Sequence, residues 1–114
     1  MSPPTFKPTL YVMEGCPYSF RFLLFLSEAQ LLDGFDVVKC DDRPECDAIK
    51  QTLEAAMGRE PSFPVVEVAP GEYMSDSDRL IDHFARLNRI DRTGLPALVF
   101  YEDSIFPQLE ALHA

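Results

Sequence analysis

The chain has 114 residues, 46% hydrophobic and 25% charged, which is the composition of one globular domain and excludes wholesale disorder. Asp and Glu total 19 against 10 Lys and Arg, so the net charge is -9. Nucleic acids and anionic membranes bind cationic surfaces, so we expect neither as a partner. The longest apolar run, Phe22 to Leu26, is far too short to span a bilayer, and the N-terminus lacks the apolar segment of a signal peptide. We therefore expect a cytoplasmic protein.

The first part of the chain predicts a strand–helix–strand unit. Thr9 to Met13 is a short run of β-forming residues. Cys16-Pro17 then marks a helix start, and the apolar spacing continues the helix from Pro17 to Leu32. This helix is apolar on two faces, so we expect it to be buried on more than one side. Phe35 to Lys39 predicts the second strand, parallel to the first through a right-handed crossover.

The middle of the chain predicts a helix, a hairpin and another helix. Glu45 to Met57 has helical spacing and ends before Gly58. Pro64 to Val68 predicts a third strand, and Tyr73-Met74 a short returning strand after a tight turn. A further amphipathic helix follows, with Ser75 as its predicted N-cap.

The order β-α-β-α-β-β-α places the chain in the α/β class. After Asp91 the pattern weakens: Leu95 to Tyr101 fits a short strand or a helical turn, and Ile105 to Leu112 fits a last short helix. We expect one domain over residues 1–90, with residues 91–114 as a C-terminal extension that packs on it.

Cys16 is the most informative residue, because it directly follows a strand and precedes a helix. Unpaired N–H groups and the helix dipole at such a position favour the thiolate form. Arg21 adds a positive charge nearby, whereas Glu14 acts in the opposite direction. Ser19 stands where a second cysteine would resolve a mixed disulfide, so this site should act through one thiol. The alternative is that Cys16 is a buried, inert residue.

Two further segments are candidates for a binding site. Phe63-Pro64 precedes the third strand, and the residues alone favour a trans peptide bond there. The run Ser75 to Asp78 places short polar side chains at a helix start. Asp can bind an ammonium group, and Ser with backbone N–H groups can bind a carboxylate, as in an amino-acid-like ligand. The alternative for this run is an N-cap with more polar side chains than it needs.

Taken together, these elements resemble the glutaredoxin and glutathione S-transferase N-terminal branch of the thioredoxin fold. The resemblance spans about Thr9 to Asn88 and includes the CPYS, Phe-Pro and MSDSDRLIDHF motifs in this order. CPYS is similar to the CPYC of dithiol glutaredoxins with its second cysteine replaced. CPYSFR also resembles a CPFSQR-like run of dehydroascorbate reductases and chloride intracellular channel proteins. The resemblance implies a thioredoxin-like α/β fold with a mixed four-stranded sheet, and glutathione as co-substrate.

The resemblance also implies roles for the residues of the first motif. Cys16 would be the catalytic nucleophile that forms a mixed disulfide with glutathione, and Tyr18 would flank its sulfur. Pro17, Ser19 and Arg21 would support this site from the same helix.

The other two motifs would bind glutathione itself. Pro64 would be the cis-proline of the family, and the Phe63 backbone would pair with the cysteinyl part. Asp76 and Ser77 would hold the γ-glutamyl end, although Asp76 is shorter than the usual Glu or Gln. Candidates for binding the glycine carboxylate, chosen by placement only, are Lys50, Gln51 and Arg59.

The sequence therefore predicts a glutathione-dependent thiol–disulfide oxidoreductase of the monothiol glutaredoxin type. Its partners would be glutathione and glutathionylated proteins or small disulfides, and the protein would be a monomer or weak dimer. One alternative is a carrier of a [2Fe–2S] cluster, although that branch usually has CGFS. Another is a non-enzymatic glutathione-binding module. Because only 26 residues follow Asn88 in this sequence, we expect no helical second domain and no conjugating transferase activity.

Cys40 and Cys46 form a second candidate site. The functional interpretations are a resolving thiol, a redox-sensing disulfide or part of a metal site; the alternative is two thiols without a role. Neither His83 nor His113 has a useful spacing from them, and the C-x-x-C spacing is absent, so we expect no metal. Acidic neighbours should raise the pKa of both thiols.

Overall fold

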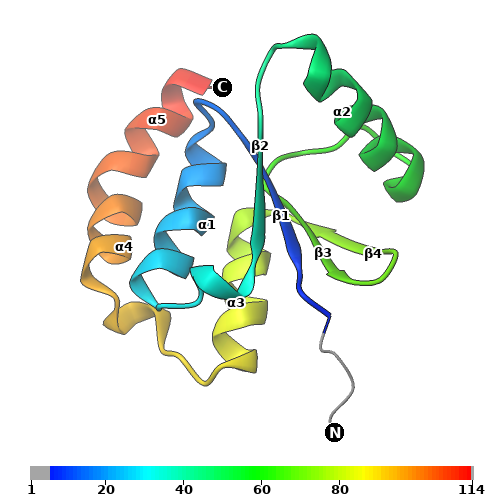
Figure 1. The fold of residues 1–114 in the computed structure, drawn as a ribbon. Helices are drawn as coiled ribbons and strands as arrows, with labels where there is room; N and C mark the ends of the chain where they lie inside the picture. Colours follow the sequence, from blue (N-terminus) through cyan, green and yellow to red (C-terminus); the bar gives the residue numbers. More distant parts are fainter. Residues whose placement is uncertain (1–5, 114) are drawn as a thin grey trace, which may run out of the picture.

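The computed structural model describes residues 6–113 and has a mixed four-stranded sheet (Figure 1). The strands are β1 (Thr9–Met13), β2 (Asp36–Cys40), β3 (Val65–Ala69) and β4 (Glu72–Ser75), in the order β2-β1-β3-β4. β2 is parallel to β1, whereas β3 pairs with β1 and with β4 in the antiparallel direction. This is the predicted thioredoxin-like α/β architecture.

The helices form two layers around this sheet. α1 contacts α3 as well as the C-terminal helices α4 and α5, which run beside α1 on the side away from α2 (Figure 1). A π-helical turn joins α4 to α5. The helices are α1 (Pro17–Glu28), α2 (Pro44–Met57), α3 (Ser77–Leu87), α4 (Pro96–Phe100) and α5 (Phe106–His113), with the π turn at Tyr101–Ile105.

The first helix ends earlier than its apolar pattern predicts. It stops at Glu28, because Gln30 adopts a left-handed conformation with φ of 61°. The N–H of Leu31 then donates to the carbonyl oxygen of Leu26 at 2.8 Å, which closes the helix end. A short 3-10 turn at Leu32–Gly34 follows. The prediction of a helix to Leu32 was therefore wrong at its end.

The predicted cap of α3 was wrong by one residue. Ser75 is the last residue of β4 and pairs with Val65, so its backbone still belongs to the sheet. Asp76 is the N-cap, and its carboxylate accepts a hydrogen bond from the N–H of Asp78 at 3.1 Å. The sequence allowed either a short strand or a helical turn from Leu95 to Tyr101, and the structure has a helix there.

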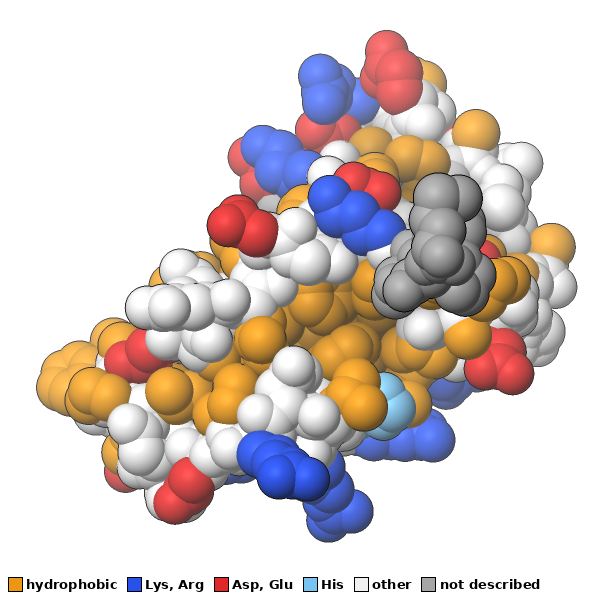
Figure 2. Space-filling model, turned by 60° about the horizontal axis from the view of Figure 1, so that its bottom comes forward, with side chains coloured by type: hydrophobic (Ala, Val, Ile, Leu, Met, Phe, Trp, Pro, Cys, Tyr) orange, Lys and Arg blue, Asp and Glu red, His pale blue; other side chains and the backbone are white. Residues whose placement is uncertain are grey.

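The main core lies between the sheet and the α1/α3 layer. Phe22 is fully buried, and its ring lies 5.9–6.2 Å from the rings of Phe25, Phe35 and Phe84. Each buried aromatic side chain of this kind stabilises the fold by about 2 kcal/mol. On the α2 side, only Cys46 and Leu53 of the helix are buried. One face of the molecule also has a hollow in which hydrophobic side chains gather (Figure 2).

The C-terminal helices are attached to α1 at both of its ends. The carboxylate of Glu28 accepts hydrogen bonds from the N–H groups of Ala97 and Leu98 at 2.8 and 2.9 Å, which caps α4. The buried hydroxyl of Tyr101 donates to the carbonyl oxygen of Pro17 at 2.7 Å. The division of the chain into two parts at residue 90 remains a prediction. In the part of the chain that the structure describes, no helix is long and apolar enough to cross a membrane.

Candidate functional site

Cys16 occupies the position directly before α1. Its backbone is extended, Pro17 is the first helical residue, and its Sγ accepts a hydrogen bond from the N–H of Ser19 at 3.4 Å. The sulfur lies 3.8 Å from the carbonyl oxygen of Phe63. The side chain is half-buried, so a small disulfide can reach it. N–H groups at a helix N-terminus stabilise negative charge, which suits a nucleophilic sulfur.

Ser19 has a structural contact that the sequence did not reveal. Its hydroxyl oxygen accepts a hydrogen bond from the N–H of Met13 at 3.0 Å, and the residue is only 2% exposed. This bond joins the end of β1 to the first turn of α1. The residue at the place of a second cysteine therefore helps to hold the loop that carries Cys16.

The Phe63–Pro64 segment lies beside the thiol. Its peptide bond is cis, as the family resemblance implied and contrary to the expectation from the residues alone. Pro64 is buried at the start of β3, and Phe63 is partly buried. The segment therefore presents backbone atoms of Phe63 to a molecule bound at the Cys16 sulfur.

A polar cavity of about 500 Å³ adjoins this segment. Arg59 lines it and donates a hydrogen bond from Nη2 to Oγ of Ser75 at 2.9 Å. Of the three candidates for a carboxylate contact, Arg59 is the one that lines this cavity, whereas Lys50 and Gln51 do not. Sequence reasoning gave no role to Ser62 and Arg79, although Ser62 precedes the Phe-Pro motif and Arg79 lies within MSDSDRLIDHF. The lining residues are Tyr18, Arg59, Ser62, Phe63, Ser75, Asp76, Ser77 and Arg79.

The N-terminus of α3 forms one wall of the polar cavity. Asp76 is exposed and has a φ of 81°, while Ser77 is 2% exposed. Helix N-termini bind carboxylates through their N–H groups, and the Asp76 carboxylate can bind an ammonium group. The cavity thus brings Tyr18, Phe63, Asp76 and Ser77 together, with Cys16 close to Phe63.

Tyr18 connects this cavity to the last helix. Its hydroxyl donates to Oε2 of Glu110 at 3.1 Å, and its ring packs edge-on against Phe106 at 5.2 Å between centroids. Burial raises the pKa of Tyr18, and so do the hydrogen bond and negative charge of Glu110. Tyr18 therefore stays a neutral hydrogen-bonding group at physiological pH.

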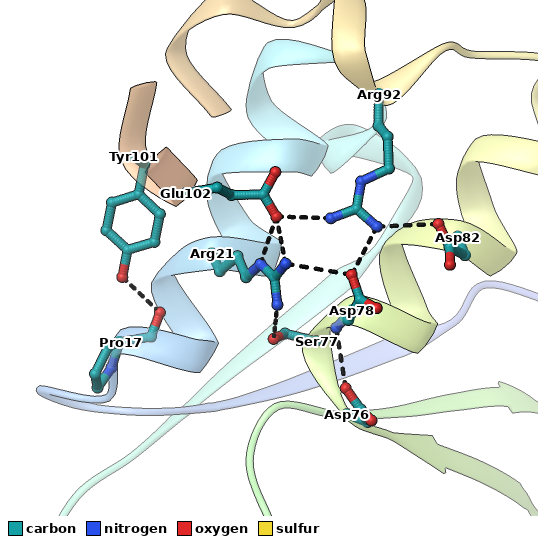
Figure 3. A network of polar contacts seen from close by, with 9 residues as sticks. All are labelled: Pro17, Arg21, Asp76, Ser77, Asp78, Asp82, Arg92, Tyr101 and Glu102. Atoms are coloured by element: carbon teal, nitrogen blue, oxygen red, sulfur yellow. Dashed lines mark hydrogen bonds and ion pairs between the residues drawn. The ribbon is translucent and has the colours of Figure 1, made fainter. Parts of the chain in front are cut away.

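A charged network next to the site joins α1, α3 and the C-terminal part of the chain (Figure 3). The Arg21 guanidinium forms an ion pair with Glu102 and contacts Oγ of Ser77 at 3.4 Å and Asp78 at 3.2 Å. Arg92 binds the same Glu102 oxygen at 2.7 Å. Sequence reasoning found Arg21 but missed Glu102 and Arg92, because no local pattern links positions so far apart.

Arg92 also connects two acidic residues of α3. Its Nη1 lies 2.8 Å from Asp78 and 3.0 Å from Asp82. Burial disfavours the charged form of Arg92, but the hydrogen bonds that it donates to Asp82 and Asp78 outweigh this effect, so the pKa of Arg92 is raised. Arg92 therefore keeps its positive charge between these two carboxylates across the ordinary pH range.

The other side of Cys16 is apolar. A second cavity of about 470 Å³ is lined by Cys16 itself and by side chains of α1 and the C-terminal helices. Glu14 and Lys39 are its charged members. Its apolar side chains include Val12, Pro17, Phe20, Leu23, Tyr101, Leu109 and Leu112.

Cys40 and Cys46 are buried away from these cavities. The pKa of Cys40 is raised to about 11, first by burial and then by the neighbouring Cys46, while Asp41 contributes least. The predicted direction is thus confirmed for Cys40, but the acidic neighbour is not the main cause. Within the described residues, no three His, Cys, Asp or Glu side chains gather to hold a metal ion. His83 is exposed and contacts the ring of Phe84.

Comparisons with known proteins agree on the fold. A glutaredoxin 2 from Chlamydomonas reinhardtii, solved in its oxidized form, is 25% identical with a TM-score of 0.54, over 82% of this chain and 78% of that one. A possible glutathione S-transferase from Rhodopseudomonas palustris is 23% identical with a TM-score of 0.55, over 70% of this chain. The match covers 39% of that chain, so this protein spans about two fifths of its length.

A third structure is less similar in sequence. The glutathione transferase Omega 2C from Trametes versicolor is 19% identical with a TM-score of 0.50, over 94% of this chain and 46% of that one. No curated protein matches the chain. The family described as "Glutathione S-transferase, N-terminal domain" matches residues 10–89, which is well over half of the chain. The chain therefore belongs to the glutathione S-transferase N-terminal domain family, within the glutaredoxin-like group of thioredoxin folds.

Proposed function

We propose that the protein is a glutathione-dependent thiol–disulfide oxidoreductase that acts through Cys16 alone. The observation that carries this proposal is the position of the Cys16 sulfur. It lies at the N-terminus of α1, 3.8 Å from the Phe63 carbonyl oxygen, next to the polar cavity. A ligand that has a thiol between two charged ends fits this arrangement, and glutathione is such a ligand.

Each part of glutathione has a complementary group in the proposed complex. The cysteinyl part would pair with the Phe63 backbone, which places its sulfur at Cys16. The ammonium of the γ-glutamyl end would bind Asp76, and its carboxylate would bind Ser77 and the N–H groups of α3. The glycine carboxylate would bind Arg59, which already donates to Ser75 at 2.9 Å.

The proposed cycle has two thiol–disulfide exchanges. The Cys16 thiolate attacks the glutathione sulfur of a substrate R–S–S–G, so that R–S⁻ leaves and takes up a proton. A thiolate of a second glutathione then attacks the Cys16–glutathione disulfide, which releases oxidised glutathione and restores Cys16. The sum is RSSG plus GSH giving RSH plus GSSG. Ser19 cannot form a disulfide, so the second glutathione does the work of a resolving cysteine.

The substrates would be glutathionylated proteins and small disulfides. The half-exposed sulfur is consistent with a large leaving thiol, because the substrate need not be enclosed. A [2Fe–2S] carrier is the alternative that the family resemblance leaves open, and no contact among the described residues favours it. The cytoplasmic location and the monomeric or weakly dimeric state remain predictions.

The test is a glutathione-coupled reduction of a glutathionylated peptide by the full chain. Cys16→Ser should lower turnover at least about a thousandfold, because serine is a far weaker nucleophile. Cys46→Ser is the matched control and should retain turnover. Equal turnover of Cys16→Ser and the wild type would overturn the proposal. Glutathione binding without any turnover would instead favour a non-enzymatic glutathione-binding module.

A further inference from the structure

Arg21 is fixed in one orientation by the C-terminal part of the chain. It lies on α1, five positions after Cys16, and its side chain is only 15% exposed. Its Nε donates to Oε2 of Glu102 at 2.7 Å, and its Nη2 binds the same oxygen. The guanidinium also lies over the ring of Phe106, 4.8 Å from the centroid. These contacts direct the remaining nitrogen, Nη1, toward α3 (Figure 3).

The contact of Nη1 with Ser77 determines what the Ser77 hydroxyl can do. A guanidinium has only donors, so at 3.4 Å the Ser77 oxygen is the acceptor. The hydroxyl therefore keeps its own proton for another partner. Among the described residues, Arg21 is the hydrogen-bond partner of the Ser77 hydroxyl, and Ser77 lines the polar cavity. Its proton is thus available to an acceptor inside that cavity, of which a carboxylate is the strongest.

Glu102 keeps Arg21 from turning elsewhere. Its side chain is 18% exposed, and one of its oxygens binds both Arg21 and Arg92. The other carboxylate that contacts Arg21 is Asp78 at 3.2 Å, and Asp78 also binds Arg92 at 2.8 Å. Without the charge of Glu102, Arg21 would be left with Asp78, which is exposed and which it shares with Arg92. Glu102 also lies in the π-helical turn, and such turns are frequent at functional sites.

We infer that Arg21 and Glu102 are positioning residues for the γ-glutamyl end of glutathione. Glu102 orients Arg21, and Arg21 occupies the acceptor side of the Ser77 hydroxyl, so that its proton points to the ligand carboxylate. The pair also holds the N-terminus of α3 against α1, at a set distance from Cys16. The identity of the ligand rests on the proposed function, whereas the hydrogen-bond arrangement does not.

The test compares two substrates that differ only at the γ-glutamyl end. One is a glutathionylated peptide, and the other is the same peptide joined by a disulfide to cysteinylglycine. For Glu102→Gln we expect the KM of the first substrate to rise about tenfold with kcat within about twofold, since a hydrogen bond to a charged group is weakened. The KM of the second substrate should stay within about twofold of the wild type.

Asp103→Asn is the matched control, because it removes the same charge from the next residue, which is exposed. It should leave both KM values unchanged. Arg21→Lys is the second variant: it keeps the charge but loses the planar fork, so we expect the same selective rise. A merely structural role would raise both KM values alike in Glu102→Gln and Arg21→Lys, and that result would overturn the inference. An unchanged KM for the glutathionylated peptide would overturn it as well.

Calorimetric binding of S-methylglutathione separates this inference from the proposed function. If the wild type binds it but has no turnover, while Glu102→Gln binds it about tenfold more weakly, the inference stands and the oxidoreductase function falls. If turnover depends on Cys16 but neither variant changes substrate selectivity, only the inference falls. If the wild type does not bind S-methylglutathione at all, both fall.

Discussion

Cys16 and Cys40 lie near the same ends of two neighbouring parallel strands, Cys16 just after β1 and Cys40 at the end of β2, and yet their environments differ. Cys40 is the last residue of β2 and pairs with Met13, the last residue of β1. The N–H of Glu14 donates to the Cys40 carbonyl oxygen at 2.8 Å, so the two strand ends are tied together. Cys16 is half-buried between a polar segment and an apolar cavity, whereas Cys40 is fully buried beside Cys46.

The element that follows each strand decides the chemistry of the thiol. Cys16 directly precedes α1 and meets N–H groups that stabilise negative charge. Cys40 precedes a loop, and α2 then places Cys46 over it, so that burial raises the pKa of Cys40 to about 11. One residue type therefore gives a candidate nucleophile at one strand end and an inert thiol at the next.

The largest expected effect is in alkylation. With iodoacetamide at pH 7.5, we expect Cys16 to react at least about a hundredfold faster than Cys40 in the folded protein. Since the pKa of Cys40 is about 11, fewer than about one in a thousand Cys40 thiols are ionised at that pH. Its thiolate fraction should rise about tenfold per pH unit until pH approaches 11. Mass spectrometry of the peptides measures both rates.

Unfolding in urea is the control for this experiment, because it should remove most of the difference between Cys16 and Cys40. Comparable labelling rates of the two thiols in the folded protein would contradict the expected difference in their reactivity.

The next effect concerns the loop that carries Cys16. Ser19→Ala should lower the free energy of unfolding by about 2 kcal/mol, because the N–H of Met13 loses its acceptor. Ser27→Ala is the matched control on the same helix: Ser27 is exposed, so its replacement should change stability by less than about 0.5 kcal/mol. Urea unfolding measures both. Equal stabilities of the two variants would show that the Ser19 hydroxyl does not hold this loop.

The smallest effect is expected at the buried thiol. Cys40→Ala should cost about 1 kcal/mol of stability through the lost packing of one sulfur atom, and turnover should stay within about twofold. The reason is that Cys40 does not line either cavity beside Cys16. Unfolding and the coupled assay measure the two quantities. A tenfold loss of turnover would mean that Cys40 acts as a resolving thiol.

Local patterns predicted most of the fold. The order of strands and helices followed from apolar spacing, and Pro17 marked the start of α1 at the residue where the structure has it. The cap of α3 was misplaced because Ser75, Asp76 and Ser77 all suit an N-cap. Pairing with Val65 decided between them, since it keeps Ser75 in the sheet.

Local patterns also predicted some residues of the candidate site and not others. Cys16, Asp76 and Ser77 belong to short motifs that the family resemblance recognised. Arg59 was found by placement. Arg79 and Ser62 belong to or adjoin two of the motifs, but the sequence does not show which side chains of a motif face the cavity. Local patterns also did not predict the left-handed conformation of Gln30, which ends α1 before the apolar pattern ends.

The sequence by itself determined the β-α-β-α-β-β-α order and the place of one cysteine at a helix start, because both depend on interactions within a few residues. The tertiary structure alone decided that Glu102 and Arg92 meet Arg21 and Asp78, and that the Ser19 hydroxyl binds Met13. Arg21 and Glu102 are 81 positions apart. Only the packing of the C-terminal helices on α1 joins them, and no local period in the sequence encodes such a contact.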